Sequence, residues 1–85
     1  MDNQIVAAAN TVVPALLALE SLGYTVVVDG SLVVATAGNE RFVADDPVTV
    51  LGLVKLIETR SWSWSASDEE ITTTLGRFGW TSEPD

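Results

Sequence analysis

Apolar residues recur at helical spacing in the first part of the chain, over residues 2–22. Placed at about 100° intervals they gather on one broad arc, opposite an arc of small and polar residues. The apolar arc contains Ile5, Val6, Val12, Val13, Leu16, Leu17 and Leu19. Pro14 lies on the outer arc, where it either bends this helix or starts a second short one. The pattern predicts a long N-terminal helix that ends at Gly23, a residue suited to the left-handed conformation of a helix end.

Two β-branched runs follow, separated by Asp29 and Gly30 in the stretch YTVVVDGSLVVATA. An Asp-Gly pair between such runs is typical of a two-residue β-hairpin turn. This turn would pair Val28 with Ser31, Val27 with Leu32, and Val26 with Val33. Side chains alternate across a strand, so one face would carry Tyr24, Val26, Val28 and Val33, and the other Thr25, Val27, Leu32 and Val34. Because both faces are apolar, we expect either helices over part of each face or a second chain on one of them.

The rest of the chain predicts one more strand and two helices. The run RFVA, residues 41–44, has the composition of a short third strand. A helix then begins at Pro47 with Asp46 as its N-cap, and its core stripe is Val50, Leu53, Val54 and Ile57.

The last predicted helix is marked at both ends. Ser67 and Glu70 have the spacing of a capping box, which predicts a helix start and explains the neighbouring acids as first-turn residues. Gly79 is placed to end the helix in a Schellman motif, with Trp80 against Leu75. The prediction is therefore an α+β domain over residues 1–80, in the order α-β-β-β-α-α. A three-stranded antiparallel meander packs with a long N-terminal helix and two shorter C-terminal helices, and residues 81–85 form a disordered tail.

Net charge and amino-acid composition narrow the range of possible functions. Twelve Asp and Glu residues stand against four Lys and Arg residues, a net charge of −8, so we expect neither nucleic acid nor an anionic membrane as a ligand. The chain has no cysteine and no histidine, which removes thiolate chemistry and the commonest general base and metal ligand. We expect no enzymatic activity, no metal and no cofactor. No apolar run is long enough to span a bilayer, and we expect a cytoplasmic protein.

The tryptophans are the candidate binding residues. Trp62 and Trp64 alternate with serines, so an extended backbone would place both rings on one side. Together with Trp80 they could anchor a partner or a ligand. Large aromatic side chains also complete the cores of small domains, and we favour the interpretation that Trp62 and Trp64 cover the core between the two C-terminal helices.

Three functional hypotheses follow from these features. The first is a non-enzymatic protein-interaction domain that forms a homodimer or binds another protein, through the hairpin face with Val27, Leu32 and Val34 and the three tryptophans. The second is an acidic inhibitor or nucleic-acid mimic that docks on a basic protein. The third is a small-molecule binder that uses Trp62, Trp64 and Trp80.

Overall fold

The computed structural model describes residues 3–6 and 9–80, so the predicted tail over residues 81–85 lies outside the described residues. The elements are η1 (Ala9–Thr11), α1 (Val12–Ser21), β1 (Thr25–Asp29), β2 (Leu32–Ala37), β3 (Glu40–Ala44), α2 (Pro47–Arg60) and α3 (Asp68–Phe78). The strands form one antiparallel sheet in the order β1-β2-β3. This arrangement confirms the predicted α+β fold and its α-β-β-β-α-α order.

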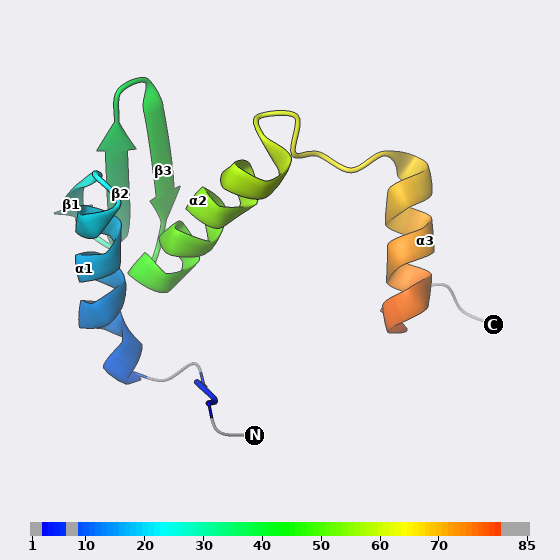
Figure 1. Ribbon diagram of the computed structural model, residues 1–85, viewed down its shortest axis with the longest axis horizontal. Coiled ribbons are helices and arrows are strands. Elements are labelled where there is room, and N and C mark those ends of the chain that lie inside the picture. The colour runs from blue at the N-terminus through cyan, green and yellow to red at the C-terminus, as the bar shows by residue number, and fades with distance from the viewer. Residues whose placement is uncertain (1–2, 7–8, 81–85) are drawn as a thin grey trace.

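The core lies between one face of the sheet and the two helices α1 and α2 (Figure 1). Its centre is a set of side chains with at most a few per cent of their surface exposed: Leu19, Val33, Ala35, Phe42, Val50 and Val54. Val50 and Val54 belong to the predicted core stripe of α2, and Leu53 and Ile57 pack against the core beside them. This sheet face, which also carries Val26, is called the inner face below.

The N-terminal helix is shorter than predicted. Residues 3–6 have no regular secondary structure, and α1 begins only at Val12, after the 3-10 turn η1. Pro14 therefore lies in the first turn of α1, where its missing N–H has no intrahelical acceptor to lose. The helix buries Ala15 and Leu19, whereas Val13 and Leu17 of the predicted apolar arc are 60% and 57% exposed.

The hairpin turn is also displaced from its predicted position. The strands pair Asp29 with Leu32 and Val28 with Val33, so the two turn residues are Gly30 and Ser31 rather than Asp29 and Gly30. Gly30 has φ of 63° while Ser31 does not have a positive φ, an arrangement that suits a turn with glycine at its first central position. Each pairing moves by two residues, so the two predicted faces keep their membership.

The C-terminal elements begin and end as predicted. Asp46 caps α2 by accepting hydrogen bonds from the backbone N–H and the hydroxyl of Thr49, at 2.8 and 2.7 Å. With 14 residues α2 is longer than α1, which has 10, so the predicted order of helix lengths is wrong. At the start of α3 both hydrogen bonds of the Ser67 and Glu70 capping box are present.

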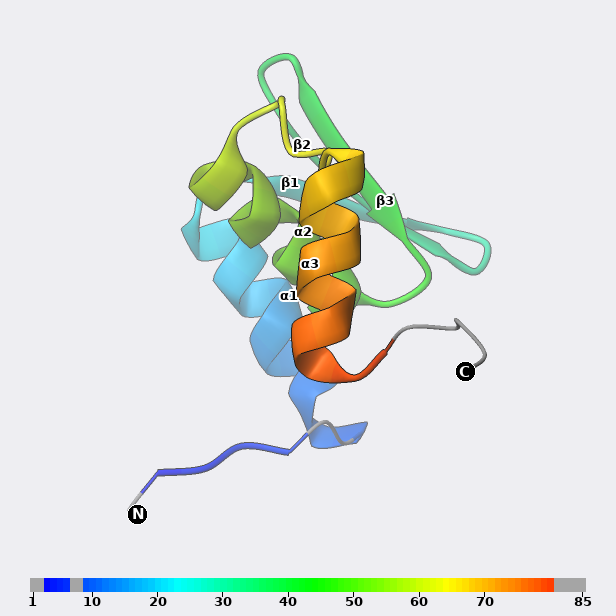
Figure 2. The same ribbon diagram turned by 90° about the vertical axis from the view of Figure 1, so that its right-hand side faces the viewer.

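The helix α3 stands away from the core, contrary to the prediction that it packs with the sheet. It buries none of its residues, and α2 lies between α3 and the sheet (Figures 1 and 2). The chain has a radius of gyration of 15.9 Å, whereas a compact chain of this length has about 12 Å. The amphipathic helix α3 is therefore an arm beside a small two-layer core.

Candidate functional site

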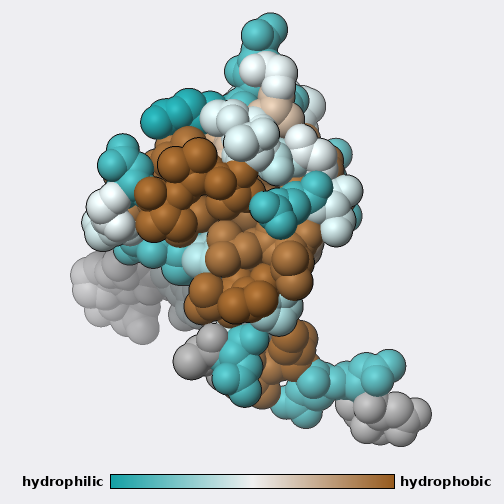
Figure 3. Space-filling model, turned by 90° about the vertical axis from the view of Figure 1, so that its left-hand side faces the viewer, coloured by the Kyte–Doolittle hydropathy of each residue, from teal (hydrophilic) through white to brown (hydrophobic). Residues whose placement is uncertain are grey.

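The face of the sheet opposite the helices is apolar and uncovered. We call it the outer face; it carries Val27 and Leu32, which are 54% and 44% exposed, and the half-buried Val34 and Val43. Val27, Val34 and Val43 form one row across the three strands. The side of the molecule on which β1, β2 and α1 lie shows wide apolar areas (Figure 3). The hairpin, which was predicted to be apolar on both faces, thus has helices over one face only.

One charge of each sign flanks the apolar row of the outer face. Arg41 pairs with Thr36 at one end of the sheet, and Asp29 pairs with Leu32 at the other. Both side chains are exposed, and neither makes an ion pair with any residue that the structure describes. The outer face therefore has an apolar centre with a positive and a negative end.

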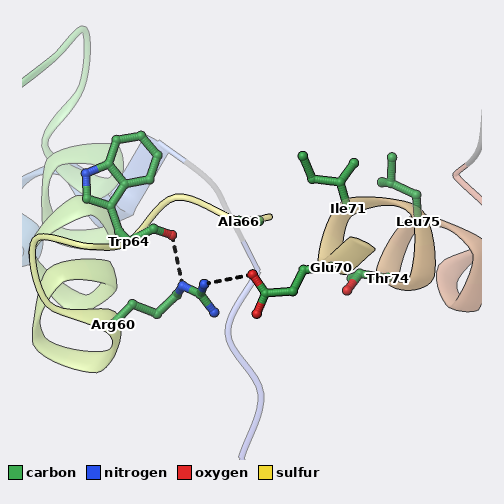
Figure 4. A pocket seen from close by; sticks show the side chains of 7 residues that line it. All are labelled: Arg60, Trp64, Ala66, Glu70, Ile71, Thr74 and Leu75. Atoms are coloured by element: carbon green, nitrogen blue, oxygen red, sulfur yellow. Dashed lines mark hydrogen bonds and ion pairs between the residues drawn. The ribbon is translucent and has the colours of Figure 1, made fainter. Parts of the chain in front are cut away.

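The segment between α2 and α3 is held by Arg60. The Arg60 Nε donates to the carbonyl of Trp64 at 2.9 Å, and Nη2 donates to the carbonyl of Ser65 at 3.3 Å. The same Nη2 lies 3.5 Å from Glu70 Oε1, an ion pair that ties the first turn of α3 to the end of α2 (Figure 4). We call these three contacts the Arg60 clamp.

The clamp is supported by the electrostatics of Glu70. The Glu70 carboxylate accepts a hydrogen bond from the Ser67 N–H at 2.9 Å, and this bond, followed by the Arg60 charge, lowers the pKa of Glu70 below its ordinary value. Asp46 has a lowered pKa for a similar reason, since its carboxylate accepts from the backbone and side chain of Thr49. Both carboxylates have structural roles at helix starts.

Backbone strain marks the start of the same segment. Ser61 has φ of 61° and ψ of −169° and is the one non-glycine residue with positive φ among those described. This conformation is normally restricted to glycine. Ser61 turns the chain sharply at the end of α2, and its N–H still donates to the Ile57 carbonyl at 2.7 Å.

The structure separates Trp80 from Trp62 and Trp64. The Trp62 ring stacks on Phe42, with centroids 5.7 Å apart, and is 56% exposed. Trp62 and Trp64 line the same hollow of about 210 Å³ beside β3 and α2. Trp80 lies instead beside Phe78, with centroids 6.1 Å apart, and is 75% exposed. Trp62 roofs the core against β3, and not between α2 and α3 as predicted.

Tyr24 contacts the same Phe42 ring on which Trp62 stacks. Its ring meets Phe42 edge-on at 5.8 Å, and its hydroxyl donates to Glu40 Oε1 at 3.3 Å. Burial, and then the neighbouring Glu40 charge, raise the pKa of Tyr24 above its ordinary value. The three rings of Tyr24, Phe42 and Trp62 therefore close one end of the core.

The apolar side of α3 is a candidate surface that the sequence reasoning missed. Ile71 and Leu75 project from the same side of the helix (Figure 4), and Phe78 continues the stripe at 61% exposure. A hollow of about 410 Å³ lies between this helix and the linker, lined by Arg60, Trp64, Ala66, Glu70, Ile71, Thr74 and Leu75. The spacing of Ile71, Leu75 and Phe78 in the sequence indicates a helix, but it does not show that this side of the helix is left uncovered.

Neither a metal-binding cluster nor a membrane-spanning helix is found in the described part of the chain. No three acidic, histidine or cysteine side chains there lie close enough together to hold a metal ion. No helix formed by those residues is long and apolar enough to cross a bilayer. Comparison with models of protein families, with curated proteins and with solved structures finds no significant match.

Proposed function

We propose that this chain is a non-enzymatic, cytoplasmic protein-interaction domain that acts as a homodimer. The observation that carries the proposal is the uncovered outer face, in which Val27, Val34 and Val43 form a continuous row. A sheet that is apolar on both sides and covered on one leaves a surface that water solvates poorly. Because copies of the same chain are present together, a second copy is the partner that we propose for this face.

The direct test is sedimentation equilibrium at micromolar concentration, where we expect the full chain to be dimeric. Val27→Asp places a carboxylate on the outer face, and we expect it to weaken the dimer about 100-fold because an unpaired charge becomes buried. Val48→Asp is the matched control, since Val48 is 41% exposed on α2. A monomeric parent protein, or equal effects of the two variants, would contradict the proposal.

A further inference from the structure

The strand β3 has a neighbouring strand on one side only, and we propose that its free edge binds an extended peptide segment of another protein. The peptide adds a fourth strand to the sheet and places one apolar side chain in the hollow that Trp62 and Trp64 line beside β3 and α2. This contact uses the edge of the sheet and not its outer face. It is therefore separate from the homodimer proposed above.

The turn between β2 and β3 determines which backbone groups face the free edge. Residues 38–39 form a two-residue turn, so the pair that flanks it, Ala37 and Glu40, is hydrogen-bonded. In an antiparallel ladder, hydrogen-bonded pairs alternate with pairs that are not hydrogen-bonded. Arg41 and Val43 therefore belong to the second kind, and their backbone N–H and C=O groups point away from β2.

The other hairpin leads to the same assignment independently. Counted from its turn at residues 30–31, the same alternation commits the backbone groups of Val34 and Thr36 in β2 to β1. These two residues are the β3 partners of Val43 and Arg41. No hydrogen bond with another element in the described part of the chain uses the backbone of Arg41 or Val43. The edge thus offers two donors and two acceptors, the pattern that an added strand requires.

The hollow beside this edge has the size of a single side chain. It measures about 210 Å³, whereas pockets for drug-sized molecules usually measure about 300 to 1,000 Å³. Its lining comes from β3, α2 and the linker: Arg41, Phe42, Val43, Leu53, Leu56, Ile57, Trp62 and Trp64. In an added strand, the residue opposite Phe42 has its side chain on the same side of the sheet as Phe42. This is the inner side, where the core and α2 lie, so that side chain enters the hollow.

The neighbours of that residue determine the rest of the peptide. Their side chains point to the outer side of the sheet, beside Arg41 and Val43. Arg41 is exposed and makes no ion pair with the described residues, so an acidic side chain opposite it gains an unpaired positive charge. Beside Val43 a β-branched residue continues the valine row. In the antiparallel orientation the peptide therefore reads β-branched, large apolar, acidic from its N-terminus.

The two tryptophans are held in place before any peptide binds. The Trp62 ring stacks on Phe42 with centroids 5.7 Å apart, and the Trp64 carbonyl accepts from Arg60 Nε at 2.9 Å. Even so, Trp62 and Trp64 remain 56% and 47% exposed. Binding to a preformed site loses less conformational entropy than binding to a mobile one, and tryptophans are prominent among the residues that dominate binding energies.

Amide hydrogen exchange measured by NMR tests the added strand. The full-length protein is titrated with the peptide acetyl-Thr-Val-Phe-Glu-Thr-amide. In the free protein, we expect the amides of Arg41 and Val43 to exchange at least about tenfold faster than that of Phe42, which bonds β2. At saturating peptide both should slow at least about fivefold. The Val28 amide, at the free edge of β1 by the same alternation, is the matched control and should not change.

The hollow is tested by a change in each partner. Replacing phenylalanine with serine in the peptide should weaken binding at least about tenfold, and this change leaves the fold of the protein untouched. In the protein, Trp64→Ala should also weaken binding about tenfold. Trp80→Ala is its matched control, because Trp80 contacts Phe78 and does not line the hollow. Equal effects of the two tryptophan variants would contradict the use of the hollow.

An exchange of charges tests the contact with Arg41. Arg41→Glu should weaken binding of the peptide roughly five-fold, and it should strengthen binding of the version with lysine in place of glutamate by a similar factor. A merely structural role of Arg41 would weaken both peptides alike. Lys55→Glu makes the same change in net charge on α2, where the Lys55 side chain is 78% exposed, and should alter neither affinity by more than about two-fold.

Two results of the exchange experiment would overturn the inference outright. If saturating amounts of peptide left the exchange of Arg41 and Val43 unchanged, no strand would be added to β3. If both amides were already protected in the free protein, and more strongly at higher protein concentration, a second copy would occupy the edge. The peptide readouts do not depend on the contact at the outer face, so failure of the homodimer and failure of this inference are separate results.

Discussion

Replacement of Trp62 by alanine tests whether this ring belongs to the folded core. The ring is 56% exposed and stacks on Phe42, so a little under half of its roughly 250 Å² is buried. At about 25 cal/mol per Å² that burial contributes about 2 to 3 kcal/mol, and stacking adds about 0.5 to 1.5 kcal/mol. We expect a loss of about 3 kcal/mol, a large part of the roughly 4 to 13 kcal/mol expected for a domain of this length.

The matched control is the same substitution at Trp80. This ring is 75% exposed and follows a helix that buries none of its residues, so we expect Trp80→Ala to cost about 1.5 kcal/mol or less. Both variants are unfolded in urea and followed by far-ultraviolet circular dichroism, below the dissociation constant of the dimer so that association does not contribute. Equal losses would refute the assignment of Trp62 to the core and leave it as a free binding surface.

Three further predictions concern strain, pH and salt. Ser61→Gly should stabilise the fold by about 1 kcal/mol in urea denaturation. Glycine relieves about 1 to 3 kcal/mol of backbone strain, which exceeds the cost of about 0.4 to 1 kcal/mol from the added entropy of the unfolded chain. Ser61→Ala should bring no gain. Asp46 and Glu70 have pKa values below their ordinary 3.8 and 4.5, so their stabilisation is present above those values and is lost as the pH falls through the lowered pKa values. Asp46→Asn keeps a capping side chain and should flatten the acid limb of a plot of stability against pH. Raising the salt concentration should leave the dimer unchanged or tighten it in sedimentation equilibrium, since both copies are acidic. A dimer that weakens in salt would mean that opposite charges, and not apolar contact, hold it together.

Local signals predicted the helix ends well. The Ser67 and Glu70 capping box depends only on atoms three residues apart, and its two hydrogen bonds are at 2.9 and 3.1 Å. The end of α3 is equally local: Trp80 N–H donates to the Leu75 carbonyl at 2.9 Å, with Gly79 at φ of 72°. Such motifs close within one or two turns of chain, so tertiary packing has little influence on them.

The start of α1 was not predictable in the same way. The pattern left open whether Pro14 bends one long helix or starts a second one. In the structure the chain reaches Val12 through the 3-10 turn η1, which shifts the angular phase of the residues before α1 relative to those within it. The buried positions are consequently Ala15 and Leu19, and Val13 and Leu17 face outward. Periodicity identified the helix and Pro14 marked a possible start for it, while the exact start depended on the 3-10 turn before Val12.

The hairpin illustrates a different limit of sequence reasoning. Asp29-Gly30 and Gly30-Ser31 are both acceptable turn pairs, and the choice between them depends on how the strands pack with β3 and the helices. Because the two registers differ by an even step, the assignment of Val27, Leu32 and Val34 to one face survived the error. The exposure of that face, and the separation of α3 from the core, are tertiary properties that no local pattern carries.

The acidic charge and the proposed self-association are compatible because they occupy different parts of the surface. Of the twelve acids, Asp29 is the one placed by the strand register on the outer face, where Arg41 provides an opposite charge. The remaining repulsion acts between charges outside the contact, and at physiological ionic strength interactions beyond about 8 Å are largely screened. Burial of apolar surface, in contrast, acts only at direct contact, where the valine row of the outer face meets the surface that covers it. In the proposed homodimer the net charge and the contact therefore act on different parts of the surface, and the uncovered sheet is the place where a second copy would bind.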